Sequence, residues 1–279
     1  MRLRSLLFVP GDRPDRMAKA LGLGADALIL DLEDAVAPGA KPAARQAVAA
    51  FLAQPRDHGV QLFVRINPVD GPLAAEDLAA ILPARPDGIV LPKAEGLVSL
   101  HALAARGVEH IPILPIVTET PTAIFRLGEY AGASLPLAGL TWGAEDLPAA
   151  IGATTAREAD GSYTAPYQLA RSLTLFAAHA AGTAAIETVY PDFRDLDGLA
   201  AYAARGQRDG FTGMMAIHPA QVPVINAAFT PSDQDIARAQ AIVDLFAANP
   251  GAGALQLDGK MVDAPHLKAA QALLARARG

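Results

Sequence analysis

The chain has 279 residues, of which 52% are hydrophobic and 19% are charged, and it contains no cysteine. A chain of this length and composition can bury a large core. Disulfides, thiolate nucleophiles and thiolate metal ligands are excluded, so any metal must be held by oxygen or histidine. The formal net charge of −6 argues against a nucleic-acid partner, but local cations can still bind an anionic small ligand.

No stretch approaches the roughly 20 uninterrupted apolar residues that a membrane helix needs. The opening residues show a brief apolar run without a small-residue cleavage pattern, and we interpret this run as a first strand. We therefore expect no membrane association and a cytoplasmic location.

Short apolar runs that end in Gly, Pro, Asn or an acid recur along the chain and alternate with Ala-rich stretches of helical spacing. The runs cover residues 3–9, 27–32, 61–66, 88–92, 111–118, 137–142, 184–190 and 212–217. The helical stretches include residues 41–52, 74–82, 99–106, 167–181 and 196–208. Eight alternations predict an α/β fold, a (β/α)8 TIM barrel over residues 1–230. A doubly wound sheet would alternate similarly, but no Gly-x-Gly-x-x-Gly follows an early strand.

The chain continues beyond the eighth run as a C-terminal helical extension, residues 231–279. Its pattern predicts helices at 231–248 and 265–278, separated by a turn-rich segment and a short apolar run at 254–257. The extension is too short for an independent core, so we expect it to pack on the barrel or on a neighbouring subunit.

Two carboxylates, Glu119 and Asp146, follow two of the hydrophobic runs. The carboxyl ends of barrel strands form active sites, so these two acids are candidates to share a small hard cation. Mg²⁺ is typically held by one or two carboxylates, with water and substrate oxygens filling the other positions, and it can act as a Lewis acid on a keto acid. The alternative is helix capping, because Pro121 and Pro148 follow closely.

Arg65 lies between apolar neighbours inside a predicted strand, where an unpaired guanidinium would be unfavourable. We expect it to meet an anion, either a ligand or an internal partner such as Glu33 or Asp34. Asp31, Glu33 and Asp34 place three acids within four residues, which requires basic partners or a metal's water shell. We assign Glu33 and Asp34 a supporting role around the metal site.

Two further polar residues at strand ends are weaker candidates. Lys93 could act as a Schiff-base nucleophile, but Pro92 and Glu95 beside it favour an ordinary ion pair. His218 could be a base or a ligand, although a single histidine at a strand end more often makes a local hydrogen bond.

With these residues in view, the sequence resembles the citrate lyase beta-chain-like family of CoA-ester lyases within the HpcH/HpaI aldolase superfamily. The resemblance spans nearly the whole chain. It rests on RSLLFVPG at 4–11, DLEDAV at 31–36 with Lys41 and Arg45, VRIN at 64–67, LPK at 91–93, ET at 119–120, GAEDL at 143–147 and IHPAQ at 217–221.

The resemblance implies a TIM barrel with Glu119 and Asp146 as Mg²⁺ ligands and with Arg65 contacting the keto-acid oxygen. It also implies that Glu119 and the segment from Gly143 through Ala144 and Glu145 bind substrate, the carboxylate being held by backbone amides around residues 144–146. One departure is that Met214 stands where the family usually has lysine, so any ion pair or CoA-phosphate contact at that position is missing.

The resemblance further implies a homotrimer or hexamer in which the C-terminal segment covers a neighbour's active site. An acid of that segment matches Asp263, which becomes the candidate to exchange a proton at the thioester α-carbon. The expected reaction is cleavage or formation of the carbon–carbon bond between an acyl thioester and a 2-keto acid, with a malyl-CoA, citramalyl-CoA or citryl-thioester type of substrate.

Three alternatives stay open at this point. The same site could hydrolyse malyl-CoA if water took part in place of the keto acid. A pyruvate-type aldolase without CoA would need no thioester pocket. A non-catalytic subunit would only bind a keto acid or an acyl carrier protein.

Overall fold

We analysed a computed structural model that describes residues 2–55 and 59–278. The chain divides into two compact units, one comprising Leu3–Ala227 and the other comprising Ala228–Gly279 with Met1–Arg2. Within the described residues, no helix has both the length and the apolar character needed to cross a membrane.

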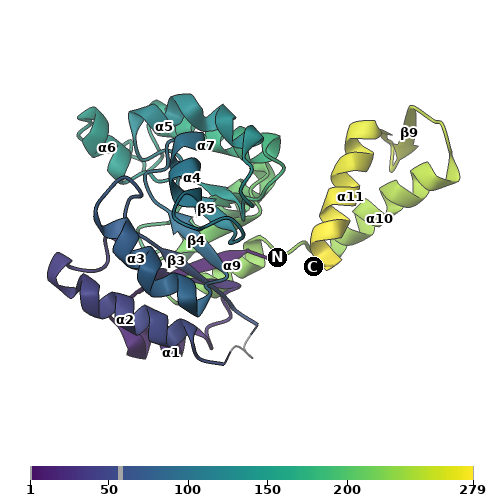
Figure 1. Cartoon of the computed structure of the whole chain (residues 1–279). Helices are drawn as coiled ribbons and strands as arrows, with labels where there is room; N and C mark the ends of the chain where they lie inside the picture. The colour runs from purple at the N-terminus through teal and green to yellow at the C-terminus, as the bar shows by residue number, and fades with distance from the viewer. Residues whose placement is uncertain (1, 56–58, 279) are drawn as a thin grey trace. The chain divides into compact units, whose positions relative to one another are not determined.

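The first unit is built on eight parallel strands surrounded by helices (Figure 1). The strands are β1 (Ser5–Pro10), β2 (Ala27–Asp31), β3 (Gln61–Arg65), β4 (Gly88–Leu91), β5 (Ile113–Pro115), β6 (Leu140–Thr141), β7 (Ala185–Glu187) and β8 (Gly213–Ala216). They are hydrogen-bonded in the order β5-β4-β3-β2-β1-β8-β7-β6. Parallel bridges from Ile113 to Leu137 and from Ile116 to Thr141 join the two ends. The sheet is therefore a nearly closed barrel, and the predicted TIM-barrel fold is confirmed.

The strands form because their apolar residues are buried on both faces. All five residues of β2 and all four of β4 are buried. Inside the barrel, Phe63 lies against Gly88, where an added Cβ would come within 2.1 Å of the ring. The glycine thus makes room for the largest side chain of the inner core cluster.

Among the described residues of this unit, nine helices and three 3₁₀ turns connect or flank the strands. The helices are α1 (Pro14–Ala20), α2 (Lys41–Leu52), α3 (Leu73–Ile81), α4 (Leu97–Ala104), α5 (Pro121–Arg126), α6 (Asp146–Ile151), α7 (Ala165–Ala180), α8 (Leu196–Asp209) and α9 (Gln221–Ala228). The 3₁₀ turns are η1 (Pro38–Ala40), η2 (Leu82–Ala84) and η3 (Leu127–Gly132). The helix predicted at 41–52 has the bounds of α2, and the other predicted helices begin or end within two residues of the observed ones.

The second unit consists of α10 (Asp233–Ala248), the antiparallel hairpin of β9 (Ala254–Leu257) and β10 (Lys260–Asp263), and α11 (Ala264–Arg278). The hairpin turn uses Asp258 and Gly259, both with positive φ, as a two-residue turn of type I′ requires. Ala239, Ile242, Val262, Ala270 and Leu274 form its small buried cluster. The sequence analysis predicted the two helices but did not identify the hairpin.

Candidate functional site

A cavity of about 900 Å³ lies at the carboxyl ends of the barrel strands. Its walls come from residues that end or follow β1, β2, β3, β5, β6, β7 and β8, so it lies where barrel enzymes bind their substrates. The sequence-predicted residues that line it are Asp34, Arg65, Glu119, Gly143, Ala144, Glu145, Asp146 and His218.

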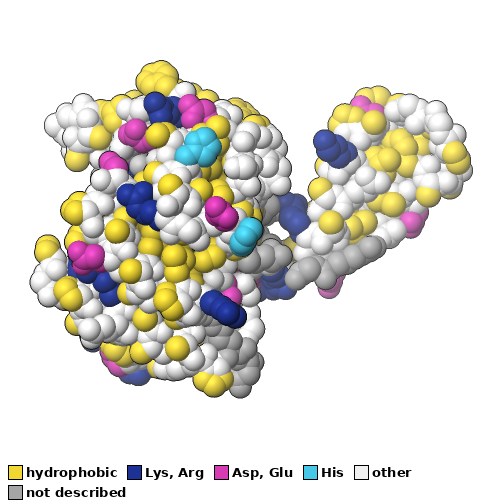
Figure 2. All heavy atoms as spheres, viewed as in Figure 1, with side chains coloured by type: hydrophobic (Ala, Val, Ile, Leu, Met, Phe, Trp, Pro, Cys, Tyr) yellow, Lys and Arg dark blue, Asp and Glu magenta, His cyan; other side chains and the backbone are white. Residues whose placement is uncertain are grey.

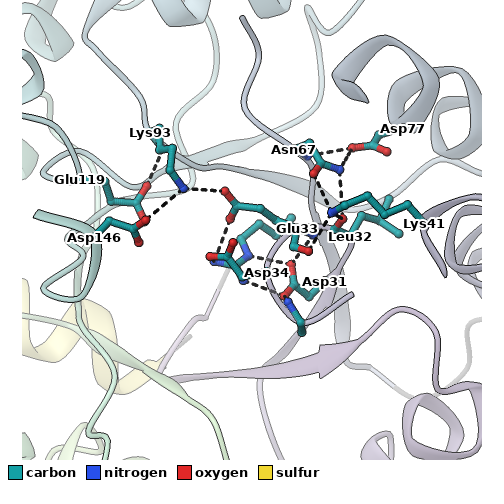
Figure 3. A network of polar contacts seen from close by, with 12 residues as sticks. Asp31, Leu32, Glu33, Asp34, Lys41, Asn67, Asp77, Lys93, Glu119 and Asp146 are labelled. Carbon is teal, nitrogen blue, oxygen red and sulfur yellow. Dashed lines mark hydrogen bonds and ion pairs between the residues drawn. The ribbon is translucent and has the colours of Figure 1, made fainter. Parts of the chain in front are cut away.

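Glu119 and Asp146 lie side by side at this cavity (Figure 3). Glu119 is buried, whereas the Asp146 side chain keeps 34% of its surface exposed. Neither acid caps a helix. Thr120 caps α5 by accepting from the Ala123 N–H at 3.1 Å, and Asp146 is already the first residue of α6. The helix-capping alternative is therefore wrong for both residues, and their carboxylates face the cavity.

Burial, together with the nearby negative charges of Asp146 and Glu33, raises the pKa of the Glu119 carboxyl to about 8. A hydrogen bond from the Lys93 backbone N–H to Oε2 opposes this shift. Gly143 makes room for the side chain, because a Cβ there would lie 2.9 Å from Glu119 Cγ. Two acids held this close together are a favourable place for a cation.

The two carboxylates suit Mg²⁺ better than a metal ion whose ligands all come from protein side chains. Across residues 2–55 and 59–278, no group of three or more His, Asp or Glu side chains is arranged to hold a metal. Two carboxylates beside a large cavity leave the remaining coordination positions to water and substrate oxygens, which is the usual arrangement for Mg²⁺.

Arg65, the last residue of β3, forms the internal salt bridge that the sequence analysis held as an alternative. Its Nε and Nη2 atoms each lie 2.7 Å from an oxygen of Asp31, and Nη1 lies 3.0 Å from Glu33. Although burial lowers the pKa of this guanidinium, the bond to Asp31 and the neighbouring carboxylates raise it. The guanidinium also lines the cavity and lies over the Phe8 ring at 4.8 Å, so a fixed cation faces any bound ligand.

Lys93 pairs with partners other than the one expected. Its Nζ lies 2.9 Å from Glu33 and 3.2 Å from Asp146, whereas Glu95 accepts from the Thr120 hydroxyl. The expected pair with Glu95 is wrong because Lys93, in the left-handed region with φ of 50°, turns toward the acids of the site. Burial lowers its pKa, but the hydrogen bond to Glu33 and the nearby carboxylates raise it more. This favours a charged ammonium over a Schiff-base nucleophile.

The segment after β2 is held by buried polar contacts. Lys41 donates from Nζ to the carbonyls of Leu32 and Glu33 at 2.8 and 2.9 Å and to Asn67 Oδ1 at 2.8 Å (Figure 3). Glu33 is thereby fixed between Arg65 and Lys93, while Asp34 is exposed and lies 3.8 Å from Arg65. Glu33 therefore shapes the charge of the site, and Asp34 lies at its solvent side.

The segment that follows β6 is anchored by Thr118. The Gly143 N–H donates to Thr118 Oγ1 at 3.0 Å, and the hydroxyl donates back to the Gly143 carbonyl. The Gly143 amide is thus engaged within the protein, so Gly143 provides space rather than an amide for substrate. Ala144, Glu145 and Asp146 also line the cavity.

His218 makes the local contact that was expected of it. Its Nδ1 accepts from the Ala220 N–H at 3.2 Å, and its ring stacks on Phe193 with 4.7 Å between centroids. Met214 is fully buried in β8, and the neighbouring Met215 lines the cavity instead. The methionine at the usual lysine position is therefore not part of the described cavity wall.

Two cations of the cavity were missed by the sequence analysis. Arg16 and Lys19 lie three residues apart on α1, both exposed, and line the outer cavity with Leu23. The sequence feature that could have identified them is the i, i+3 spacing of the two cations on the helix that follows the first strand. On the face drawn in Figure 2, Lys and Arg side chains are interspersed with acidic and neutral ones.

Asp263 belongs to the second unit, where it ends β10. Its Oδ1 lies 2.6 Å from Nδ1 of His266, a residue that the sequence analysis did not identify. Its proposed role in proton exchange stays a prediction.

Comparison with known proteins identifies the family. A model described as HpcH/HpaI aldolase/citrate lyase matches residues 4–219. The chain belongs to this family. A model described as a C-C bond lyase of the TIM-barrel fold matches residues 163–279, and the predicted family is thereby confirmed.

Members of the HpcH/HpaI family with curated names match along nearly the full chain. A citrate lyase subunit beta-like protein of Mycobacterium tuberculosis is 39% identical, covering 97% of this chain and 94% of its own length. A (3S)-malyl-CoA thioesterase of Cereibacter sphaeroides is 36% identical, covering 98% and 94% respectively. A mitochondrial citramalyl-CoA lyase of Rattus norvegicus is 34% identical, covering 96% and 84%.

A solved structure of the family agrees with the fold over both units. The CitE protein of M. tuberculosis in complex with magnesium, acetoacetate and coenzyme A is 37% identical and superposes with a TM-score of 0.84, covering 100% of this chain and 99% of that chain.

Proposed function

We propose that this protein is a Mg²⁺-dependent carbon–carbon lyase that cleaves a 3-hydroxyacyl-CoA ester into a 2-keto acid and an acyl-CoA, or catalyses the reverse condensation. The observation that carries the proposal is the pairing of Glu119 and Asp146 beside the fixed cation of Arg65 in one large cavity. Named relatives that act on citrate, malyl-CoA or citramalyl-CoA support the same class of substrate.

Glu119 and Asp146 would hold Mg²⁺, which when bound supplies Lewis-acid polarisation of the keto-acid oxygens. Arg65, held in place by Asp31, would stabilise the negative charge that develops on the same oxygen. The amides near Ala144 and Asp146 are proposed to orient the substrate carboxylate.

The balance of the cleavage requires a group that exchanges a proton with C2. The bond between C2 and C3 of the acyl chain breaks, and its electron pair goes to C2 as the thioester enolate. The C3 hydroxyl releases its proton to solvent water as the keto-acid carbonyl forms, and C2 gains a different proton. Asp263 is proposed to give that proton in cleavage and to remove it in condensation.

The cavity is far larger than a keto acid needs, and its outer wall carries Arg16 and Lys19. Cations at the mouth of an active site can bind phosphate groups of a coenzyme. This favours a free CoA ester over a carrier-bound thioester and over a CoA-independent aldolase. A homotrimer or hexamer and a cytoplasmic location belong to the proposal through the family resemblance.

Hydrolysis of a malyl-CoA type ester is the second candidate, favoured by the relative named (3S)-malyl-CoA thioesterase. A panel of 3-hydroxyacyl-CoA esters with a C3 carboxylate separates the two. A lyase releases 2-keto acid without free thiol, whereas a thioesterase releases free thiol and no keto acid. Absence of both products across the panel would contradict the proposal.

A further inference from the structure

A histidine holds the carboxylate that the proposed function uses for proton exchange. Asp263 is the last residue of β10, and His266 lies three residues later in the first turn of α11. The distance from His266 Nδ1 to Asp263 Oδ1 is 2.6 Å. Within the described chain, the Asp263 side chain is 34% exposed and the His266 side chain is 52% exposed. Both remain accessible to a ligand.

The distance indicates that Nδ1 of the ring is the donor to the carboxylate. A nitrogen and a carboxylate oxygen at 2.6 Å need a hydrogen between them, and an ionised carboxylate can only accept. Nδ1 of His266 is therefore the donor. The Asp263 backbone N–H lies 3.3 Å from the same Nδ1, but a protonated Nδ1 has no lone pair to accept from it. This tautomer is inferred from geometry.

We propose that His266 is a positioning residue for Asp263. By donating to Oδ1, the imidazole restricts the rotation of the carboxylate and leaves Oδ2 available to meet the thioester α-carbon. A base oriented by a third group is held close to its reactive geometry, which increases the rate of proton transfer without adding a contact to the substrate. The inference rests on the proposed role of Asp263.

A purely structural role for this pair makes a different prediction. Aspartate is a preferred N-cap residue, and Asp263 directly precedes α11. A capping carboxylate accepts from backbone amides of the first helical turn, and the histidine side chain is then dispensable. The Asp263 carboxylate instead contacts the imidazole ring of His266. The two accounts therefore differ in what the loss of the ring does to proton exchange.

The test uses the full chain and three variants, His266→Ala, His266→Asn and Lys268→Ala. The asparagine amide can place a donor close to the Nδ1 position, whereas alanine cannot, and Lys268 is a matched exposed position on the same helix. We expect His266→Ala to lower kcat for α-proton exchange of the acyl-CoA in D₂O by about 10-fold or more, with KM unchanged. His266→Asn should restore most of the rate, and Lys268→Ala should match the wild type.

Exchange at the wild-type rate in His266→Ala, or an equal loss in the alanine and asparagine variants, would overturn the positioning role. Nitrogen NMR of the wild-type imidazole gives a readout that does not depend on activity. We expect the tautomer protonated at Nδ1, and the tautomer protonated at Nε2 alone would refute the inference. If the wild type has neither lyase nor exchange activity, the proposed function fails instead, while the tautomer still decides the geometry of the pair.

Discussion

Arg65 and Asp31 are register partners at the carboxyl ends of β3 and β2, and two guanidinium nitrogens lie 2.7 Å from the two Asp31 oxygens. Asp31 is held in turn by the backbone N–H groups of Glu33 and Ala35, at 2.9 and 3.0 Å. The guanidinium that lines the cavity is thus positioned by the barrel itself. This makes Arg65 a preorganised group rather than a mobile side chain.

Replacing Arg65 with lysine should affect turnover more than binding of the metal. Lysine keeps the charge but cannot make the bidentate pair with Asp31, so we expect Arg65→Lys to slow turnover by about 10²-fold. Mg²⁺ affinity should stay close to that of the wild type. Steady-state kinetics and calorimetry measure the two effects. Wild-type turnover with a strongly lowered melting temperature would instead make the arginine purely structural.

The raised pKa of Glu119 predicts a pH-dependent stability of the metal-free protein. With a pKa of about 8 in the folded state and about 4.3 in the unfolded state, the folded chain retains a proton that the unfolded chain has released. Stability is therefore fully present below about pH 4.3 and is lost as the pH rises through 8. Glu119→Gln removes this loss, so at pH 8.5 we expect the variant to be more stable than the wild type by about 5 kcal/mol.

Urea unfolding in EDTA at pH 5 and pH 8.5 measures this difference. The exposed acid Asp34 offers a control, because Asp34→Asn should not produce the same gain at high pH. If wild type and Glu119→Gln respond equally to pH, Glu119 does not carry a raised pKa in the folded protein.

The charged state of Lys93 predicts that the protein forms no Schiff base. Its ammonium is paired with Glu33 and Asp146, and its pKa is raised, so it should not attack a keto-acid carbonyl at neutral pH. Treatment with pyruvate and sodium borohydride should leave the intact mass unchanged. A covalent adduct mapped to Lys93 would reverse this conclusion and assign the chain to the amine-dependent aldolases.

A site shared between subunits predicts complementation. Asp263→Asn should retain Mg²⁺ and keto-acid binding but lose proton exchange, whereas Glu119→Ala should lose the metal site. If Asp263 acts in a neighbour's barrel, mixing the two inactive variants should restore part of the activity once subunits exchange. A lack of rescue, with exchange demonstrated by mass spectrometry of tagged subunits, would show that each site is completed within its own chain.

The sequence was sufficient for the barrel because each strand overlaps one of the eight short apolar runs, and these runs alternate with stretches of helical spacing. The run at 111–118 shortens to β5 and the run at 137–142 to β6, since the barrel is joined there by isolated bridges rather than by a continuous ladder. Glu119 and Asp146 were found by the same logic, because residues at the carboxyl ends of parallel strands lie at one face.

The sequence could not identify ion-pair partners that lie far apart along the chain. The pairing of Lys93 with Glu33 depends on the turn at Lys93, and the pairing of Arg65 with Asp31 depends on strand register. Local charge proximity suggested Glu95 for Lys93. For Arg65 it suggested Glu33 or Asp34, of which Glu33 lies 3.0 Å away, but it did not identify Asp31. His266 was not predicted as a functional residue, because a histidine in a predicted helix does not by itself indicate a role. Its contact with Asp263 depends on the hairpin, which places Asp263 at the start of the helix.

The most direct test of the central claim is the product balance of CoA-ester cleavage with and without Mg²⁺, comparing wild type, Asp146→Ala and, as a control at an exposed acid of α8 outside the cavity, Asp197→Ala. We expect the wild type and Asp197→Ala to release 2-keto acid and acyl-CoA in equal amounts, and we expect EDTA or Asp146→Ala to abolish both products while the fold is retained. Cleavage that persists in EDTA and in Asp146→Ala would contradict the account, as would free thiol released without keto acid.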